Sequence, residues 1–411
     1  MTNTWNDVND SPPVPPGSFS QRAFLWYFLR LGVLGFGGPI ALAAAMQRDL
    51  VEERQWITAP EYTEGLAFSQ LAPGPLAAQL AMYLGWVRSG LAGATSVGLV
   101  FIAPSFLMTV VLAVAYLRYG GLSWMQGAFY GVGAAVIAIV AQGGWRLMRK
   151  TVSKDYLLWA IVAVNAVVTA WTETEVVWLF IASGLLVLAV RTWSEQKKRR
   201  VASATALALV PLPMLGYLLT PPAWLTSGIR GPAPADTLTR IAWFFAKSGA
   251  VVFGSGVAIV PFLHGGVVSD FHWLSERQFL DAVAVSMLTP GPVVITVAFI
   301  GYLVAGPLGA IAAAVGVFLP VYLFVVLVAR HYHQFAGNTR VKAAVSGVTA
   351  AATGAILGAV VVLGRRALID VPTWAIFAVA LGLVLWVRRI PEPVLILAAG
   401  IVGVVVHGLA A

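Results

Sequence analysis

The chain has 411 residues, of which 59% are hydrophobic and only 10% are charged, and its mean hydropathy is +0.84. Such a chain cannot cover its apolar surface with polar side chains in water, so the composition excludes a soluble globular protein and indicates an all-α, polytopic membrane protein in a lipid bilayer. The absence of cysteine excludes disulfides, thiolate metal sites and a cysteine nucleophile, and basic loops at a membrane account for the net charge of +9 without a nucleic acid partner.

Residues 1–20 are rich in proline and polar side chains and lack the features of a cleavable signal, so they predict a disordered N-terminal tail. Apolar segments of roughly 20 residues, each long enough to cross a bilayer, then recur to the end of the chain. We expect about 13 transmembrane helices, at about 23–46, 61–85, 91–117, 124–147, 155–171, 175–192, 202–219, 240–262, 276–304, 306–330, 341–363, 372–388 and 393–410.

These segments divide into a first six-helix module at 21–200, a connector helix and loop at 201–235, and a second six-helix module at 236–411. Lys and Arg accumulate on the cytoplasmic side of membranes. Basic clusters follow even-numbered spans and predict a cytoplasmic N-terminus, whereas Arg365 and Arg366 fall on the opposite side. One connector helix between two six-helix modules makes the second module inverted relative to the first, an arrangement common in transporters.

An internal repeat supports this division of the chain. Ser69-Gln-Leu-Ala-Pro-Gly-Pro75 returns 217 residues later as Ser286-Met-Leu-Thr-Pro-Gly-Pro292. The same offset relates further pairs of positions, and an offset of 216 relates pairs beyond the motif. These pairs are Phe28/Phe245, Arg30/Lys247, Trp56/Trp273 and Glu64/Asp281, followed by Gly85/Gly301, Gly90/Gly306 and Pro104/Pro320. A duplicated membrane module is the simplest cause.

The Pro-Gly-Pro motifs must break their helices, because proline lacks a backbone N–H and glycine is free to leave the helical conformation. A broken helix is tolerated in the membrane only where it is buried in protein or lines a polar cavity. The N–H groups and the dipole of the next half-helix favour an anion. The alternative is a kink that serves packing. The motif residues are Pro73, Gly74 and Pro75, and Pro290, Gly291 and Pro292.

A second matched pair consists of Gly35-Phe-Gly-Gly-Pro39 and Phe253-Gly-Ser-Gly256, which include Gly37, Gly38, Gly254 and Ser255. These glycines predict either a further break or close helix packing. If both matched pairs converge, four half-helix ends surround one cavity.

Ionisable residues deep within predicted membrane spans usually face a cavity and serve function. Arg30 and Lys247 lie roughly 10 Å below the membrane boundary at about 1.5 Å per residue, where they attract an anion or snorkel to the surface. Glu64 and Asp281 either stabilise helix starts or carry a coupling proton. The neutral groups of Gln70, Gln79 and Thr289 suit an oxyanion that bears its own charge.

The sequence predicts no cofactor, no metal site and no catalytic residues. It has no Gly-x-x-x-x-Gly-Lys-Ser/Thr phosphate loop, so we expect transport driven by a gradient and not directly by ATP.

Phe36-Gly-Gly-Pro39, Gln70-Leu-Ala-Pro-Gly-Pro75, Gln79-Leu-Ala81 and Thr289-Pro-Gly-Pro292 resemble the long-chain, two-domain chromate ion transporters. This resemblance implies a bacterial inner-membrane protein with oppositely oriented halves that exports chromate and confers chromate resistance. Sulfate, which is similar in shape and charge, is the natural competitor. The alternatives are a sulfate or other tetrahedral oxyanion transporter and an integral membrane enzyme acting on lipid. The coupling ion, a proton or another, and a homodimeric assembly stay open.

Overall fold

The computed structural model describes residues 20–35, 38–72, 74–119, 122–152, 155–172, 177–196, 227–229, 231–234, 236–251, 253–254, 259–331, 338–387 and 392–410. Residues 1–19 of the predicted tail at 1–20 lie outside these residues, as do the predicted connector span at 202–219 and the predicted site residues Gly37, Pro73 and Ser255.

The first half contains helices and one short strand in the following order: α1 (Gln21–Leu34), α2 (Gly38–Met46), the π-helix η1 (Gln47–Glu53), α3 (Ala59–Leu71), β1 (Gly74–Pro75), α4 (Leu76–Tyr119), α5 (Ser123–Val152), α6 (Tyr156–Thr172) and α7 (Val177–Gln196). The second half contains β2 (Ser227–Gly228), β3 (Gly231–Pro232), α9 (Thr237–Val251), β4 (Phe253–Gly254), α10 (Ile259–His264), the π-helix η3 (Gly265–Asp270), α11 (Glu276–Leu288), η4 (Val293–Ile295), α12 (Thr296–Val328), η5 (Ala329–His331), α14 (Thr339–Ala367), α15 (Val371–Trp386) and α16 (Glu392–Ala410).

The sequence repeat is a repeat of backbone structure. In each half a π-helix, which is rare in proteins, follows the second helix. Gln55 and its counterpart His272 both have a positive φ, 53° and 50°. Thr58 and its counterpart Ser275 each form a capping box at the next helix start. The predicted duplication is therefore confirmed down to single backbone angles.

Each half begins with two helical hairpins. In the first hairpin, Phe24 near the start of α1 lies 6.2 Å, ring to ring, from Trp56 beyond η1. In the second, Phe68 of α3 lies 5.3 Å from Tyr83 of α4. These pairs can meet only if the chain reverses between them, so Gly35, where α1 ends, and Gly74 lie at hairpin tips.

The second half repeats both reversals. The ring of Phe244 in α9 lies 5.8 Å from that of Trp273, and Asp281 of α11 and Phe299 of α12 both contact Tyr116. The apolar segments predicted as spans at 23–46, 61–85, 240–262 and 276–304, of which the second and fourth were expected to break at Pro-Gly-Pro, are therefore hairpins in the structure. Hydrophobic length predicted how far the apolar segment runs, but it carries no information about the direction of the chain after a break.

Four described helices are long and apolar enough to cross a membrane, at 76–119, 123–149, 293–328 and 339–367. Two of them bend sharply, because Gly90 and Gly306 adopt φ of 57° and 60°. Met82 then folds back to within 3.1 Å of the position that a Cβ on Gly98 would occupy. These bends divide α4 and α12 each into a helix before the glycine and a helix after it.

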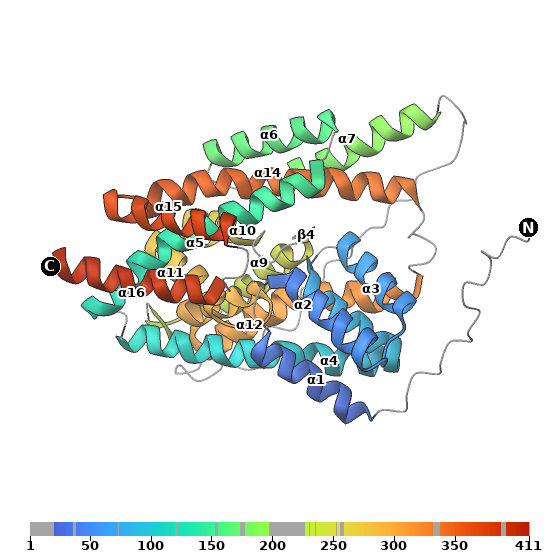
Figure 1. Ribbon diagram of the computed structural model, residues 1–411, viewed down its shortest axis with the longest axis horizontal. Coiled ribbons are helices and arrows are strands. Elements are labelled where there is room, and N and C mark those ends of the chain that lie inside the picture. Colours follow the sequence, from blue (N-terminus) through green and yellow to red (C-terminus); the bar gives the residue numbers. More distant parts are fainter. Residues whose placement is uncertain are drawn as a thin grey trace, which may run out of the picture.

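The two halves are intertwined (Figure 1). The equivalent helices α4 and α12 run antiparallel, since Thr95 near one end bonds Tyr322 at 2.7 Å while the ring of Tyr116 near the other end lies 5.5 Å from that of Phe299. Helix α5 packs against α15 and α16 of the second half, and α14 packs against α6 and α7 of the first. Glycines allow this close approach, as at Gly354 against the backbone of α6.

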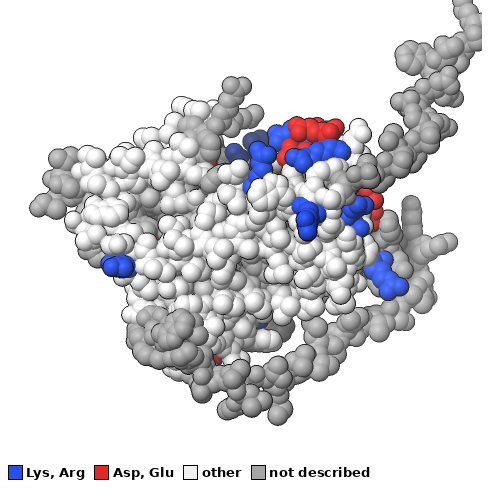
Figure 2. Space-filling model, turned by 90° about the horizontal axis from the view of Figure 1, so that it is seen from below, with Lys and Arg blue, Asp and Glu red and all other residues white. Residues whose placement is uncertain are grey.

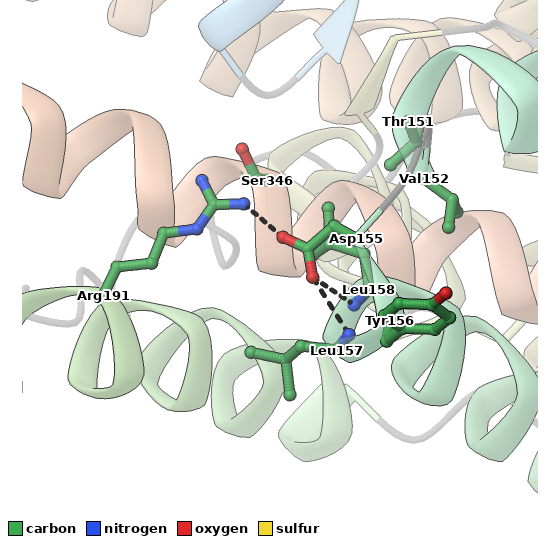
Figure 3. Close-up of a pocket in the computed structure, with 8 residues that line it drawn as sticks. All are labelled: Thr151, Val152, Asp155, Tyr156, Leu157, Leu158, Arg191 and Ser346. Carbon is green, nitrogen blue, oxygen red and sulfur yellow. Dashed lines mark hydrogen bonds and ion pairs between the residues drawn. The ribbon is translucent and has the colours of Figure 1, made fainter. Parts of the chain in front are cut away.

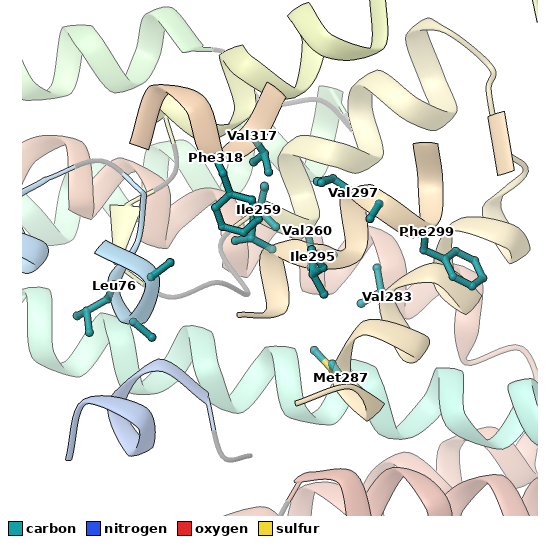
Figure 4. Close-up of a cluster of buried hydrophobic side chains, with 14 of the residues drawn as sticks. Leu76, Ile259, Val260, Val283, Met287, Ile295, Val297, Phe299, Val317 and Phe318 are labelled. Atoms are coloured by element: carbon teal, nitrogen blue, oxygen red, sulfur yellow. The ribbon is translucent and has the colours of Figure 1, made fainter. Parts of the chain in front are cut away.

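Apolar side chains fill the interior where the hairpins of the second half meet α4 (Figure 4). On the outside, large apolar side chains such as Leu99, Val111 and Leu327 are about two-thirds exposed, at 67%, 65% and 65%. Figure 2 shows that charged side chains on one face gather toward one end of the molecule and leave a wide uncharged surface. An uncharged outer surface suits lipid, and the protein is a multi-pass membrane protein.

Candidate functional site

The hairpin tips of the two halves meet in the interior. Strand β1 pairs in parallel with β4, with Gly74 opposite Phe253 and Pro75 opposite Gly254. In the reciprocal contact, the N–H of Gly291 donates to the carbonyl oxygen of Gly35 at 2.9 Å. Each Pro-Gly-Pro tip therefore contacts the glycine-rich tip of the other half, so the two matched pairs converge.

The local sequence explains the shape of each Pro-Gly-Pro tip. Helix α3 ends when Ala72 donates to Phe68, and Gly74 then takes φ of 130°, which side chains rarely allow. Its counterpart Gly291 has φ of 94°. A new helix begins at Leu76 directly after the first tip, and η4 begins directly after the second. The positive ends of two helices therefore lie beside the tips, which favours an anion there.

Ser105 of α4 is a contact that sequence reasoning missed. Its buried hydroxyl donates to the carbonyl oxygen of Pro290 at 2.6 Å and lies 3.5 Å from that of Gly32. The equivalent position in α12 holds Val321, which packs against Gly74. A serine opposite a valine gives no signal when the matching positions of the two halves are compared. The preceding residue, Pro104, does match Pro320, so it was the signal in the sequence that could have drawn attention to Ser105.

The predicted neutral groups are not all at the tips. Gln79 is fully buried, and its Nε2 lies 2.8 Å from where a Cβ on Gly74 would stand. Gln70 is exposed at the end of α3. The hydroxyl of Thr289 donates to the carbonyl oxygen of Ser286 at 2.9 Å. Gln79 is therefore a buried amide beside the first tip.

Arg30 and Lys247 lie on the outer faces of α1 and α9 and are exposed. Each follows by one turn an exposed tryptophan, Trp26 at 67% and Trp243 at 63%. The opposite face of α1 packs Gly32 on the backbone of α4. The structure thus puts neither cation against the paired tips, and their role in attracting an anion stays a prediction.

The two coupling candidates have different surroundings. Asp281 is 4% exposed, and its carboxylate accepts a hydrogen bond from Tyr116 of the other half at 2.7 Å. Glu64 is half-buried on α3. A buried carboxylate with a partner from the other half is sensitive to any movement between the halves.

Comparison with known proteins gives the family. The family model described as "Chromate transporter" matches residues 22–188 and again residues 239–404. The chain belongs to the chromate transporter family. The two matches coincide with the two structural halves, and the predicted resemblance is confirmed. Membership favours a transporter over an enzyme.

Curated relatives are similar along nearly the whole chain. It is 52% identical over 395 residues to the "Chromate transport protein" of Cupriavidus metallidurans, covering 95% of this chain and 94% of that protein. It is 52% identical over 392 residues to the "Probable chromate transport protein" of Synechococcus elongatus, covering 94% and 96%. It is 32% identical over 407 residues to the "Chromate transport protein" of Pseudomonas aeruginosa, covering 97% and 94%. No solved structure matches the chain.

A cavity of about 700 Å³ lies apart from the tips, where α5, α6, α7 and α14 meet (Figure 3). In it, Arg191 donates to Asp155 at 2.8 Å, and Asp155 also caps α6 by accepting from the backbone N–H groups of Leu157 and Leu158. Burial by itself would raise the pKa of Asp155, but these hydrogen bonds outweigh burial and hold its pKa below the usual value.

We expect Asp155→Asn to lower the melting temperature of this transporter at pH 7, because it removes the charge while keeping a good helix cap. The folded-state pKa is lowered, so the stabilisation is complete above the unfolded pKa of about 3.9 and is lost as the pH falls through the folded value. The variant should be less stable than the wild type by at most about 1 kcal/mol, since the side chains of Asp155 and Arg191 are both partly exposed. Thermal unfolding in detergent between pH 3 and pH 8 measures it. Asp236→Asn, at an exposed pair, serves as the control, and a pH-independent difference at Asp155 would contradict the assignment.

Proposed function

We propose that this chain is a gradient-driven secondary transporter that exports chromate from the cytoplasm of a bacterium across its inner membrane and so confers chromate resistance. The reciprocal contact of the hairpin tips, Gly74 with Phe253 and Gly291 with Gly35, is the observation that carries the proposal. It brings broken helices from both halves to one buried place, which is where transporters bind charged substrates. Residues proposed to surround the oxyanion are Gly37, Gly38, Gln70, Pro73, Gly74, Pro75, Gln79, Gly254, Ser255, Thr289, Pro290, Gly291 and Pro292.

An inverted relation between the modules at 21–200 and 236–411 is part of the proposal. The antiparallel packing of α4 on α12 supports it, because equivalent helices of an inverted repeat cross the membrane in opposite directions. A hairpin returns to the side it entered from, so replacing the first two spans of each module by hairpins leaves the sides of the loops after both hairpins unchanged. The N-terminus is then cytoplasmic, and the proposal keeps the connector between the modules at 201–235, most of which lies outside the described residues.

Contacts at the two ends of the bundle agree with this arrangement. At one end, Ser89 donates to Gln21 at 3.1 Å, as expected if the first two hairpins open to the same side. At the other end, Arg366 forms an ion pair with Glu276. A continuous span at 276–304 would have placed these two charges on opposite sides of the membrane, whereas a hairpin places them together.

The test uses inside-out membrane vesicles that contain the protein. We expect uptake of labelled chromate that persists in excess sulfate and falls when the proton gradient is collapsed. Uptake abolished by sulfate would instead favour a general oxyanion transporter, which accepts chromate and sulfate alike because both are small tetrahedral dianions. No uptake at equal protein levels, or turnover of a lipid by the purified protein, would refute the proposal.

Arg30 and Lys247 enter the proposal as surface charges that draw the anion toward the tips. We expect Arg30→Gln and Lys247→Gln each to lower the initial rate of chromate uptake about fivefold, the size of about 1 kcal/mol of attraction through a wet surface. Raised salt should reduce the difference by screening. Arg22→Gln, an exposed change near the start of the same helix, is the control. Unchanged rates in both variants would show that the two cations do not attract the substrate.

A further inference from the structure

Thr109 of α4 has a hydroxyl that the fold does not use. Its side chain is 0% exposed, and within the described part of the chain its Oγ1 has no hydrogen-bond partner. By contrast, the buried hydroxyls of Ser248 and Thr353 donate to backbone carbonyls, those of Phe244 at 2.9 Å and Thr349 at 2.7 Å. A buried hydroxyl without a hydrogen-bond partner destabilises a protein, so a protein that keeps one is expected to use it to bind a ligand.

The direction of Thr109 follows from its neighbours on α4. At about 100° per residue, Ser105, Thr109 and Tyr116 lie within about 40° of one another around the helix. Ser105 contacts Pro290 of the second Pro-Gly-Pro tip, and Tyr116 contacts Asp281 of α11. Thr109 therefore faces the second-half hairpin between these two contacts, about 6 Å along the helix from Ser105.

The hydroxyls on this face are not equivalent. Ser105 has already donated its proton to Pro290, and Tyr116 has donated its proton to Asp281. Thr109 alone of these three has no acceptor in the described structure. It is thus the donor on this face that is ready for an added acceptor oxygen.

The second half lacks this face. At the offset of 216, Ser105 and Thr109 correspond to Val321 and Val325 of α12. Both valines are buried, at 1% and 0% exposed, and neither can donate a hydrogen bond. The backbone is duplicated, but the hydroxyls are not.

We infer that Thr109 is a substrate-binding residue that donates its hydroxyl proton to one oxygen of a tetrahedral oxyanion held beside the Pro290–Pro292 tip. This inference rests on the proposed function and makes the site one-sided, with the anion on the tip of the second half and against α4 of the first. Ser105 is a positioning residue, because it holds the tip against α4 through the carbonyl of Pro290.

The experiment replaces Thr109 with valine, which keeps its shape and removes the hydroxyl. We expect Thr109→Val to raise the KM for chromate uptake in inside-out vesicles at least tenfold, the loss expected for one hydrogen bond to an anion. Its melting temperature in detergent should stay the same or rise, because an unpartnered buried hydroxyl has been removed. Chromate should also raise that melting temperature less than it does in the wild type.

Matched variants separate substrate binding from structure. Thr109→Ser restores a hydroxyl and should return the KM to near the wild-type value. Val325→Thr, the equivalent position in the second half, should leave the KM unchanged. If Thr109→Val fails to fold, Thr109→Ala compared with Thr109→Ser decides in the same way.

A wild-type KM in the hydroxyl-free variants would overturn the inference and indicate that a buried water is the partner of Thr109. That outcome leaves the proposed function standing. A wild-type protein that transports no chromate would instead refute the proposed function itself.

Discussion

Gly291→Ala and Gly74→Ala are each expected to abolish chromate transport and to lower the stability of the protein by about 2–4 kcal/mol. The backbone is the first reason, because φ of 94° and 130° is strained for any residue with a Cβ. Space is the second. A Cβ on Gly291 would meet the hydroxyl of Ser105, and one on Gly74 would stand 2.8 Å from Nε2 of Gln79 and 2.9 Å from Cγ2 of Val321.

Thermal unfolding in detergent and uptake in inside-out vesicles measure the two effects. Gly133→Ala is the matched control, because a Cβ there meets nothing within 4 Å in the middle of a helix. Gly90→Ala isolates the backbone cost, since Gly90 has a positive φ but open space around it. Adding Ser105→Ala to Gly291→Ala should recover part of the stability, because the residue that the new Cβ meets has lost its hydroxyl. A stable, active Gly291→Ala protein would contradict the tip geometry.

The parts of the fold that follow from local chemistry could be predicted from the sequence. Pro-Gly-Pro must interrupt a helix wherever it occurs, and Thr58 and Ser275 begin helices because their side chains cap them. Matching the two halves then showed that these interruptions come in pairs. Their meeting at the tips follows because a broken backbone in the membrane needs partners from protein.

Other features depend on long-range packing and left no local signal. The reversal at each tip depends on contacts such as Phe68 with Tyr83, which no hydropathy window contains. The outward direction of Arg30 depends on which face of α1 packs on α4. A comparison of the two halves does not single out Ser105 and Thr109, because the equivalent positions hold Val321 and Val325. A comparison that looks for matching residues misses functional groups that only one half has.

The second large effect concerns coupling to protons. We expect Asp281→Asn to abolish uptake driven by a proton gradient while chromate exchange across the membrane, which needs no net proton movement, continues. Asparagine keeps the size of the side chain and can still accept the hydrogen bond from Tyr116, but its amide cannot take up or release a proton as a carboxylate does. Asp281 joins the tip hairpin of the second half to α4 of the first, so a change in its charge alters a contact between the halves.

Three comparisons make this expectation specific to Asp281. Glu64→Gln removes the equivalent carboxylate and should slow gradient-driven uptake much less, because Glu64 is half-buried whereas Asp281 is buried. Tyr116→Phe keeps the carboxylate but removes its donor at 2.7 Å, and should weaken the dependence on the gradient without abolishing exchange. Glu52→Gln, at an exposed position, controls for loss of one negative charge. If Asp281→Asn retains gradient-driven uptake, or if Glu64→Gln is the variant that loses it, then the proton is carried elsewhere and the Tyr116–Asp281 contact serves only to join the halves.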